Sequence, residues 1–129
     1  MPRINHIHIK APDPGKTAAW WAEAFAFKIV SDEVRAFGDR FIRCRTEDGF
    51  AVTISGPRTG ETLGPGDASA HFGLEHVAFD TAAIETDIAR LTGLGAKLQD
   101  GPIQVPGGPR VAFLHGPDDV RIELVEPPK

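Results

Sequence analysis

Residues 72–79 read FGLEHVAF, and residues 2–9, PRINHIHI, follow the same pattern 70 positions earlier. At this offset His76 corresponds to His6. A fixed offset that persists along the chain is typical of a duplicated supersecondary unit. We therefore predict two copies of one module, each beginning at a histidine. Three further pairs are identical at the same offset: Gly38 and Gly108, Asp48 and Asp118, and Pro57 and Pro127. Thr53 corresponds to Glu123.

The composition favours one compact globular domain or two fused half-domains. The chain has 129 residues, 41% of them apolar, which is enough for a hydrophobic core. Its net charge is −4 and it has no basic block, so we expect no nucleic-acid partner. It has neither a signal-peptide pattern nor an apolar run of roughly 18 residues, so we expect a cytoplasmic protein that makes no membrane contact.

The first copy predicts the element order βαβββ. Residues 3–11 alternate between apolar and polar side chains, which indicates a strand. Residues 14–26 carry apolar side chains at helical spacing after an Asp-Pro capping signal. Three short extended runs follow, separated by glycine-containing turns, at residues 27–35, 39–46 and 50–55.

The second copy repeats this order, with a helix capped near Asp80 or Thr81 that ends at Gly95. Its predicted strands cover residues 71–80, 96–99, 110–115 and 120–125. The fold class is therefore α+β, with two βαβββ modules in pseudo-twofold repeat. We place the first module at 1–56, a linker rich in Gly, Pro, Thr and Ser at 57–70, and the second module at 71–129.

The repeat also predicts a metal site. In each copy a histidine precedes a last-strand position by 47 residues, and a twofold repeat brings these four positions together. Three of them, His6, His76 and Glu123, supply two nitrogen donors and one carboxylate, a ligand set typical of a divalent transition metal with open positions for substrate. The fourth position, Thr53, is a poor ligand and is expected to line the pocket.

Each candidate ligand has a simpler interpretation. A single histidine on an apolar strand is more commonly a hydrogen-bonded core residue than a metal ligand. A buried carboxylate costs several kcal/mol unless it meets a cation or a metal. Arg121, two residues from Glu123 on the same strand face, is the alternative partner. The match of both histidines at the repeat offset favours the metal.

Strand alternation places His8 on the same face as His6, which makes it the candidate acid–base group; a packed or hydrogen-bonded role is the alternative. Arg43 either enters the pocket, where it would favour an anionic substrate, or lies on a solvated face. The same alternation adds three candidate substrate-binding residues: Phe113, His115 and Arg121.

Residues 5–9 (NHIHI), 74–79 (LEHVAF) and 116–124 (GPDDVRIEL) resemble the vicinal oxygen chelate superfamily. This superfamily includes glyoxalase I, methylmalonyl-CoA epimerase, extradiol dioxygenases, and the fosfomycin and bleomycin resistance proteins. The resemblance covers essentially the whole chain. It implies paired βαβββ modules that curl into an incomplete barrel around a metal, which chelates vicinal oxygens of the substrate. It also implies a homodimer.

The resemblance places His6, His76 and Glu123 on the ligand positions of the superfamily. Thr53 stands where glyoxalase I has a metal-binding glutamate, which argues against that enzyme. The remaining set resembles the extradiol dioxygenases and the manganese site of the fosfomycin transferases. The dioxygenases usually carry a tyrosine ten residues before the glutamate ligand, where this chain has Phe113 and contains no tyrosine.

We therefore expect a metal-dependent enzyme in which Fe(II) or Mn(II), or alternatively Ni, Zn or Co, binds two oxygens of a small organic substrate. His8 and Glu123 are the expected catalytic residues. The ligand set slightly favours dioxygenase-like chemistry, and the missing tyrosine leaves lyase or isomerase chemistry of the glyoxalase or epimerase type as an alternative. A metal-free, drug-sequestering protein of the bleomycin-resistance type is the third interpretation.

Overall fold

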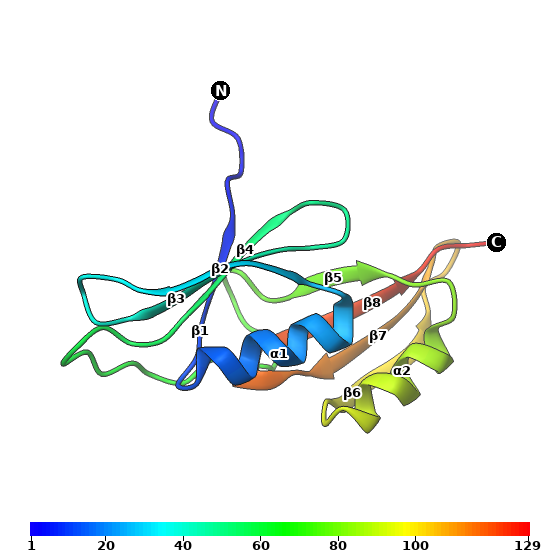
Figure 1. The fold of residues 1–129 in the computed structure, drawn as a ribbon. Helices are drawn as coiled ribbons and strands as arrows, with labels where there is room; N and C mark the ends of the chain where they lie inside the picture. The colour runs from blue at the N-terminus through cyan, green and yellow to red at the C-terminus, as the bar shows by residue number, and fades with distance from the viewer. The chain divides into compact units, whose positions relative to one another are not determined.

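The computed structural model describes all 129 residues, which divide into two compact units, Met1–Gly64 and Pro65–Lys129 (Figure 1). Each unit contains one α-helix and one four-stranded sheet in the order βαβββ. The predicted α+β class with two βαβββ modules is thereby confirmed. The boundary between the units lies within the segment 57–70.

The first unit consists of β1 (Ile7–Lys10), α1 (Pro14–Phe25), β2 (Lys28–Val34), β3 (Arg40–Arg45) and β4 (Ala51–Ser55). Its sheet has the strand order β1-β4-β3-β2. β1 runs parallel to β4, and the other pairs are antiparallel. The parallel pair is the one that the helical crossover makes possible.

The second unit repeats this topology, with the strand order β5-β8-β7-β6 and a parallel pair between β5 and β8. Neither its helix nor that of the first unit has the length and apolar character that crossing a membrane requires. Its elements are β5 (Val77–Asp80), α2 (Ile84–Gly93), β6 (Lys97–Gln104), β7 (Arg110–His115), a short 3₁₀ turn η1 (Pro117–Asp119) and β8 (Arg121–Glu126).

The helix α1 begins where the sequence predicts. The Asp13 side chain accepts a hydrogen bond from the Lys16 backbone N–H at 3.1 Å, and Pro14 occupies the first turn. The apolar side of α1 packs against β3 and β4, where Ile42 and Ile54 are buried. Because successive side chains of a strand point to opposite faces, the polar residues adjacent to these isoleucines in sequence lie on the other face of the sheet.

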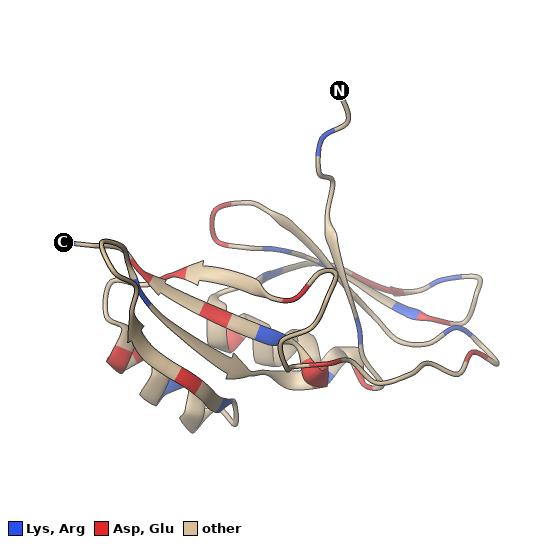
Figure 2. Ribbon diagram, turned by 180° about the vertical axis from the view of Figure 1, so that it is seen from behind, with Lys and Arg blue, Asp and Glu red and all other residues tan.

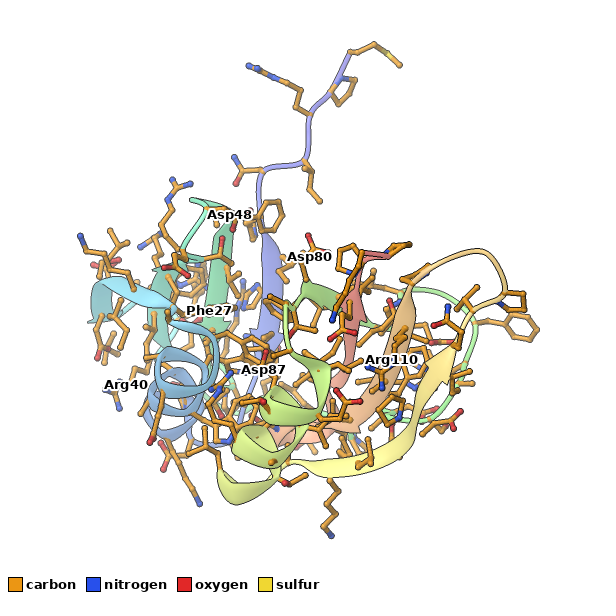
Figure 3. All side chains as sticks on the ribbon, turned by 90° about the vertical axis from the view of Figure 1, so that its right-hand side faces the viewer. Phe27, Arg40, Asp48, Asp80, Asp87 and Arg110 are labelled. Carbon is orange, nitrogen blue, oxygen red and sulfur yellow. The ribbon has the colours of Figure 1, made fainter.

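The start of α2 differs from the prediction. The helix begins at Ile84 rather than near Asp80 or Thr81, and its N-cap residue, Ala83, offers no capping side chain. Instead Glu126, from β8, accepts a hydrogen bond from the Ile84 N–H at 2.9 Å. A carboxylate is favourable at a helix N-terminus because the helix dipole is positive there. Figure 3 shows Arg110 from β7 in this region, where it pairs with the same carboxylate at 3.1 Å.

The strand β6 extends to Gln104, five residues beyond the predicted end at residue 99. Pro102 lies inside it. β6 pairs only with β7, and a proline is tolerated on such an edge strand because no second neighbour needs its missing N–H. The register shift around Asp100 accommodates the irregularity.

The first strands of both units are shorter than predicted. β1 and β5 cover four residues each, because their parallel partners provide pairing only from Val52 and Ile122 onward. His6 and His76 therefore lie immediately before their strands rather than inside them.

Candidate metal site

The second unit brings two of the three predicted ligands together. His76 precedes β5, and Glu123 lies on β8 opposite Ala78 of β5. The Nε2 atom of His76 is 3.7 Å from Oε1 of Glu123, and no hydrogen bond reaches the Glu123 carboxylate. Metal bonds of about 2.1 Å on either side of an ion span at most about 4.2 Å. These two donors can therefore share one cation without either side chain moving.

Arg121, the alternative partner considered for Glu123, pairs with another carboxylate. Arg121 makes no ion pair with Glu123; its guanidinium donates to Glu75 instead and lies 3.9 Å from the centroid of the Phe113 ring. The Arg121 side chain is only 12% exposed, so this placement is held by packing as well as by charge. Within 4 Å, the imidazole of His76 is thus the one basic side chain beside the Glu123 carboxylate.

Glu75 connects Arg121 to His76. Its Oε1 atom lies 2.8 Å from Nδ1 of His76 and is the same atom that receives Arg121. The hydrogen bond with His76 and the nearby positive charge of Arg121 lower the pKa of Glu75, against the opposing effect of its partial burial. The carboxylate is therefore ionised at neutral pH. The sequence analysis did not select Glu75, although its position immediately before a repeated histidine was a usable signal.

The first unit contributes His6, which is exposed at the end of the segment before β1. Its Nδ1 atom lies 2.7 Å from Oδ1 of Asn5. Thr53, the equivalent of Glu123, is 6% exposed and pairs in register with His8 on one side and Arg43 on the other. Within either unit, no three His, Cys, Asp or Glu side chains converge on one point.

His8 has a defined environment. Its Nε2 atom is 2.7 Å from the hydroxyl oxygen of Ser55, which is fully buried, and its ring meets Phe41 edge-on at 5.6 Å. Burial of the ring, and next the charge of Lys10, lower the pKa of His8. The ring is therefore neutral at pH 7 and able to accept a proton. Ser55 was also not among the predicted site residues. It lies two residues after Thr53 on β4 and therefore on the same face of the sheet.

Arg43 lies on the exposed part of β3. It donates to Glu33 at 2.9 Å, and its guanidinium is 4.8 Å from the centre of the Phe41 ring. Figure 2 shows acidic and basic residues interspersed along the chain. Arg43 and Glu33 form one ion pair between neighbouring strands. The charge of Arg43 is therefore already compensated in the structure.

The remaining predicted residues of the second unit share the face of Glu123. Phe113 is the direct neighbour of Glu123 on β7, and the His76 ring meets its edge at 5.6 Å. His115 pairs in register with Arg121, and its Nε2 atom is 2.8 Å from Oδ1 of Asp119. The alternation of side chains along β7 and β8 thus brings together an apolar ring and several polar groups.

The loop before His76 is held by His71. Its two ring nitrogens lie 2.7 Å from the Ser69 carbonyl oxygen and 3.0 Å from the Leu74 carbonyl oxygen. Both partners are acceptors, so both nitrogens must donate, which only the protonated ring can do. The hydrogen bonds to Ser69 and then to Leu74 raise the pKa of His71.

We expect His71 and His8 to titrate on opposite sides of the ordinary histidine value of 6.5. The raised pKa of His71 means that its stabilising contribution is complete below about pH 6.5 and is lost as the pH rises through the folded-state pKa. The lowered pKa of His8 has the opposite effect: its stabilising contribution is complete above about pH 6.5 and is lost as the pH falls through the folded-state pKa. An NMR titration of the imidazole protons measures both, with His71→Asn identifying the first signal. Equal pKa values for the two rings would contradict this assignment.

The comparisons with known proteins agree with the fold. The model of the glyoxalase/bleomycin resistance protein/dioxygenase superfamily matches residues 3–124. The chain belongs to this superfamily. No curated protein matches it.

Several solved structures share the fold of this glyoxalase superfamily member. A glyoxalase family protein from Bacillus cereus has a TM-score of 0.86 at 19% identity, and the match covers 100% of this chain and 96% of the other. The fosfomycin resistance protein FosX from Listeria monocytogenes, complexed with Mn(II) and sulfate, has a TM-score of 0.71 at 17% identity, covering 98% and 93%. TnmS3, an antibiotic-binding protein from Streptomyces sp. CB03234, has a TM-score of 0.68 at 19% identity, covering 99% and 98%.

Proposed function

We propose that this superfamily member is a metal-dependent enzyme in which His6, His76 and Glu123 hold a divalent cation, Fe(II) or Mn(II) in the first place. The observation that supports this proposal is the His76–Glu123 pair, whose facing donor atoms lie 3.7 Å apart with no hydrogen bond to the carboxylate. A carboxylate left without hydrogen bonds is costly unless a cation joins it. The Mn(II)-bound FosX structure shows that this fold can hold such an ion.

The substrate proposed is a small organic molecule with two neighbouring oxygen atoms. When bound, the ion supplies Lewis acidity toward those oxygens. Phe113 offers an apolar surface beside Glu123 and His76. Thr53, Arg43, His115 and Arg121 are the proposed polar contacts, and the two arginines favour an anionic group.

His8 is the proposed acid–base residue. Its Nε2 atom lies 2.7 Å from the Ser55 hydroxyl oxygen; in the neutral tautomer whose Nε2–H donates to that oxygen, the lone pair is on Nδ1, where a proton would be accepted and returned. The lowered pKa of His8 favours the neutral ring at neutral pH, which a general base requires. Ring-cleaving oxygen chemistry is the first choice of reaction, and lyase or isomerase chemistry of the glyoxalase or epimerase type is the alternative. We also propose a homodimer as the working form.

A second function, metal-free binding of an antibiotic or other drug, has its own support. TnmS3 is an antibiotic-binding protein and shares the fold with a TM-score close to that of FosX. In addition, neither unit by itself brings three His, Cys, Asp or Glu side chains together around one point. This class predicts a fully folded protein that needs no metal.

Elemental analysis of protein purified without added metal or chelator separates the two functions. The enzyme proposal predicts about one equivalent of iron, manganese, nickel, zinc or cobalt per chain. Iron would direct substrate screens to oxygen uptake with catechols, and manganese, nickel, zinc or cobalt to isomerisation of α-keto compounds. A folded protein that contains no metal and binds none when Mn(II) or Fe(II) is added would contradict the enzyme proposal and favour drug binding.

A further inference from the structure

The two candidate histidine ligands are held in the same way. Nδ1 of His6 lies 2.7 Å from the side-chain oxygen of Asn5, and Nδ1 of His76 lies 2.8 Å from the side-chain oxygen of Glu75. In each case the partner is the residue immediately before the histidine. The two contacts occur in separate units and at matching positions of the repeat, so each is an independent observation of one arrangement.

This arrangement decides which nitrogen carries the lone pair. The partner atoms are a carboxylate oxygen and an amide oxygen, and both are hydrogen-bond acceptors. Nδ1 of the neutral ring must therefore carry the proton, which leaves the lone pair on Nε2. In the second unit, Nε2 of His76 is the atom that faces Glu123 at 3.7 Å. The lone pair thus points to the place where a cation would lie.

The two partners differ in how firmly they are held. Glu75 also receives the guanidinium of Arg121, whose side chain is 12% exposed and stacked on Phe113. No second side chain anchors Asn5, and both Asn5 and His6 are exposed. A charged and anchored acceptor orients the ring more strictly than a neutral, exposed one, and it raises the basicity of the ligand more.

We propose that Asn5 and Glu75 are positioning residues that present Nε2 of His6 and His76 to a divalent cation. Of the two, Glu75 has the larger effect because Arg121 holds it. The part of this inference that concerns the cation rests on the proposed function. The part that concerns the tautomer of the two rings does not depend on any metal.

The first experiment tests the tautomer in metal-free protein. Long-range ¹H–¹⁵N NMR of the imidazole rings at alkaline pH, where the rings are neutral, reports which nitrogen carries the proton. We expect His76 to be protonated at Nδ1 in the wild type and in Glu75→Gln, whose amide oxygen can still accept. We expect Glu75→Leu to lose this preference. A wild-type ring protonated at Nε2 would overturn the inference.

The second experiment measures the dissociation constant for Mn(II) by titration. Loss of a residue that orients a metal-binding histidine typically weakens metal binding by about 10- to 100-fold, and we expect this for Glu75→Leu. Glu75→Gln should lose less because it keeps the acceptor, and Asn5→Leu should lose less because Asn5 is unanchored. The matched control is Glu85→Gln, which removes another arginine-paired carboxylate of the same unit and should leave Mn(II) affinity unchanged.

Circular dichroism of every variant establishes that the fold is intact, and Glu75→Gln, which preserves size, provides the test if Glu75→Leu does not fold. Unchanged Mn(II) affinity in a folded Glu75→Leu protein would overturn the proposed role toward the cation. If the wild type binds no Mn(II), the cation part and the proposed function fail together. The NMR result then still decides whether Glu75 sets the tautomer of His76.

Discussion

Replacing Glu123 or His76 by alanine is expected to remove the metal from the protein. Each variant deletes one of three proposed ligands, and the remaining two donors cannot hold a divalent ion against solvent. Because the loss of an orienting neighbour alone costs about 10- to 100-fold in metal affinity, the loss of a ligand should exceed about 100-fold. Elemental analysis of Glu123→Ala and His76→Ala, purified beside the wild type, measures this effect.

A control variant shows whether the loss is specific. Glu85→Gln removes a carboxylate of the same unit that is paired with Arg110. It should keep the wild-type metal content. If Glu123→Ala and His76→Ala also retain a full equivalent, the metal is bound elsewhere and the proposed ligand set is wrong.

Replacing Trp21 by alanine is expected to lower the free energy of unfolding by about 3–5 kcal/mol. The Trp21 side chain is completely buried between α1 and its sheet, where it stacks on Phe25 and Phe27 at centroid distances of 5.4 and 5.2 Å. Truncation would leave a cavity that rigid neighbours cannot fill. Urea unfolding followed by circular dichroism gives the change in free energy.

The neighbouring tryptophan provides the matched control. Trp20 lies on α1 beside Trp21 but is partly exposed, so Trp20→Ala should cost clearly less. Equal costs for the two variants would contradict the assignment of Trp21 to the core. The cost of Trp21→Ala also measures how much the packing of α1 on its sheet contributes to the stability of the first unit.

Much of the fold could be predicted because its signals are local. The alternation of side chains that predicts strands recurs in β3 and β4, where Ile42 and Ile54 are buried and their sequence neighbours Arg43 and Thr53 occupy the opposite face. The end of β6 could not be predicted in this way. Whether Pro102 breaks a strand depends on whether that strand has one neighbour or two, which is a property of the assembled sheet.

The candidate site was predicted in part. The repeat identified His76 and Glu123, and the structure places their donor atoms 3.7 Å apart. His6 lies in the other unit, so its place in the ligand set stays a prediction. The sequence left open whether Arg121 pairs with Glu123, because strand alternation states which face a side chain occupies but not which of two nearby carboxylates it meets; in the structure its partner is Glu75.

The sequence by itself determined the duplicated βαβββ order, the polar and apolar faces of the strands, and the residue types that meet near the matched histidines. These features follow from periodicity and from the repeat, which need no knowledge of distant contacts. Only the tertiary structure decided that Glu126 caps α2 and that Arg121 pairs with Glu75, thereby leaving Glu123 to His76. These contacts join residues more than 40 positions apart, and sheet register and the packing of the helix on the sheet determine which side chains come within reach.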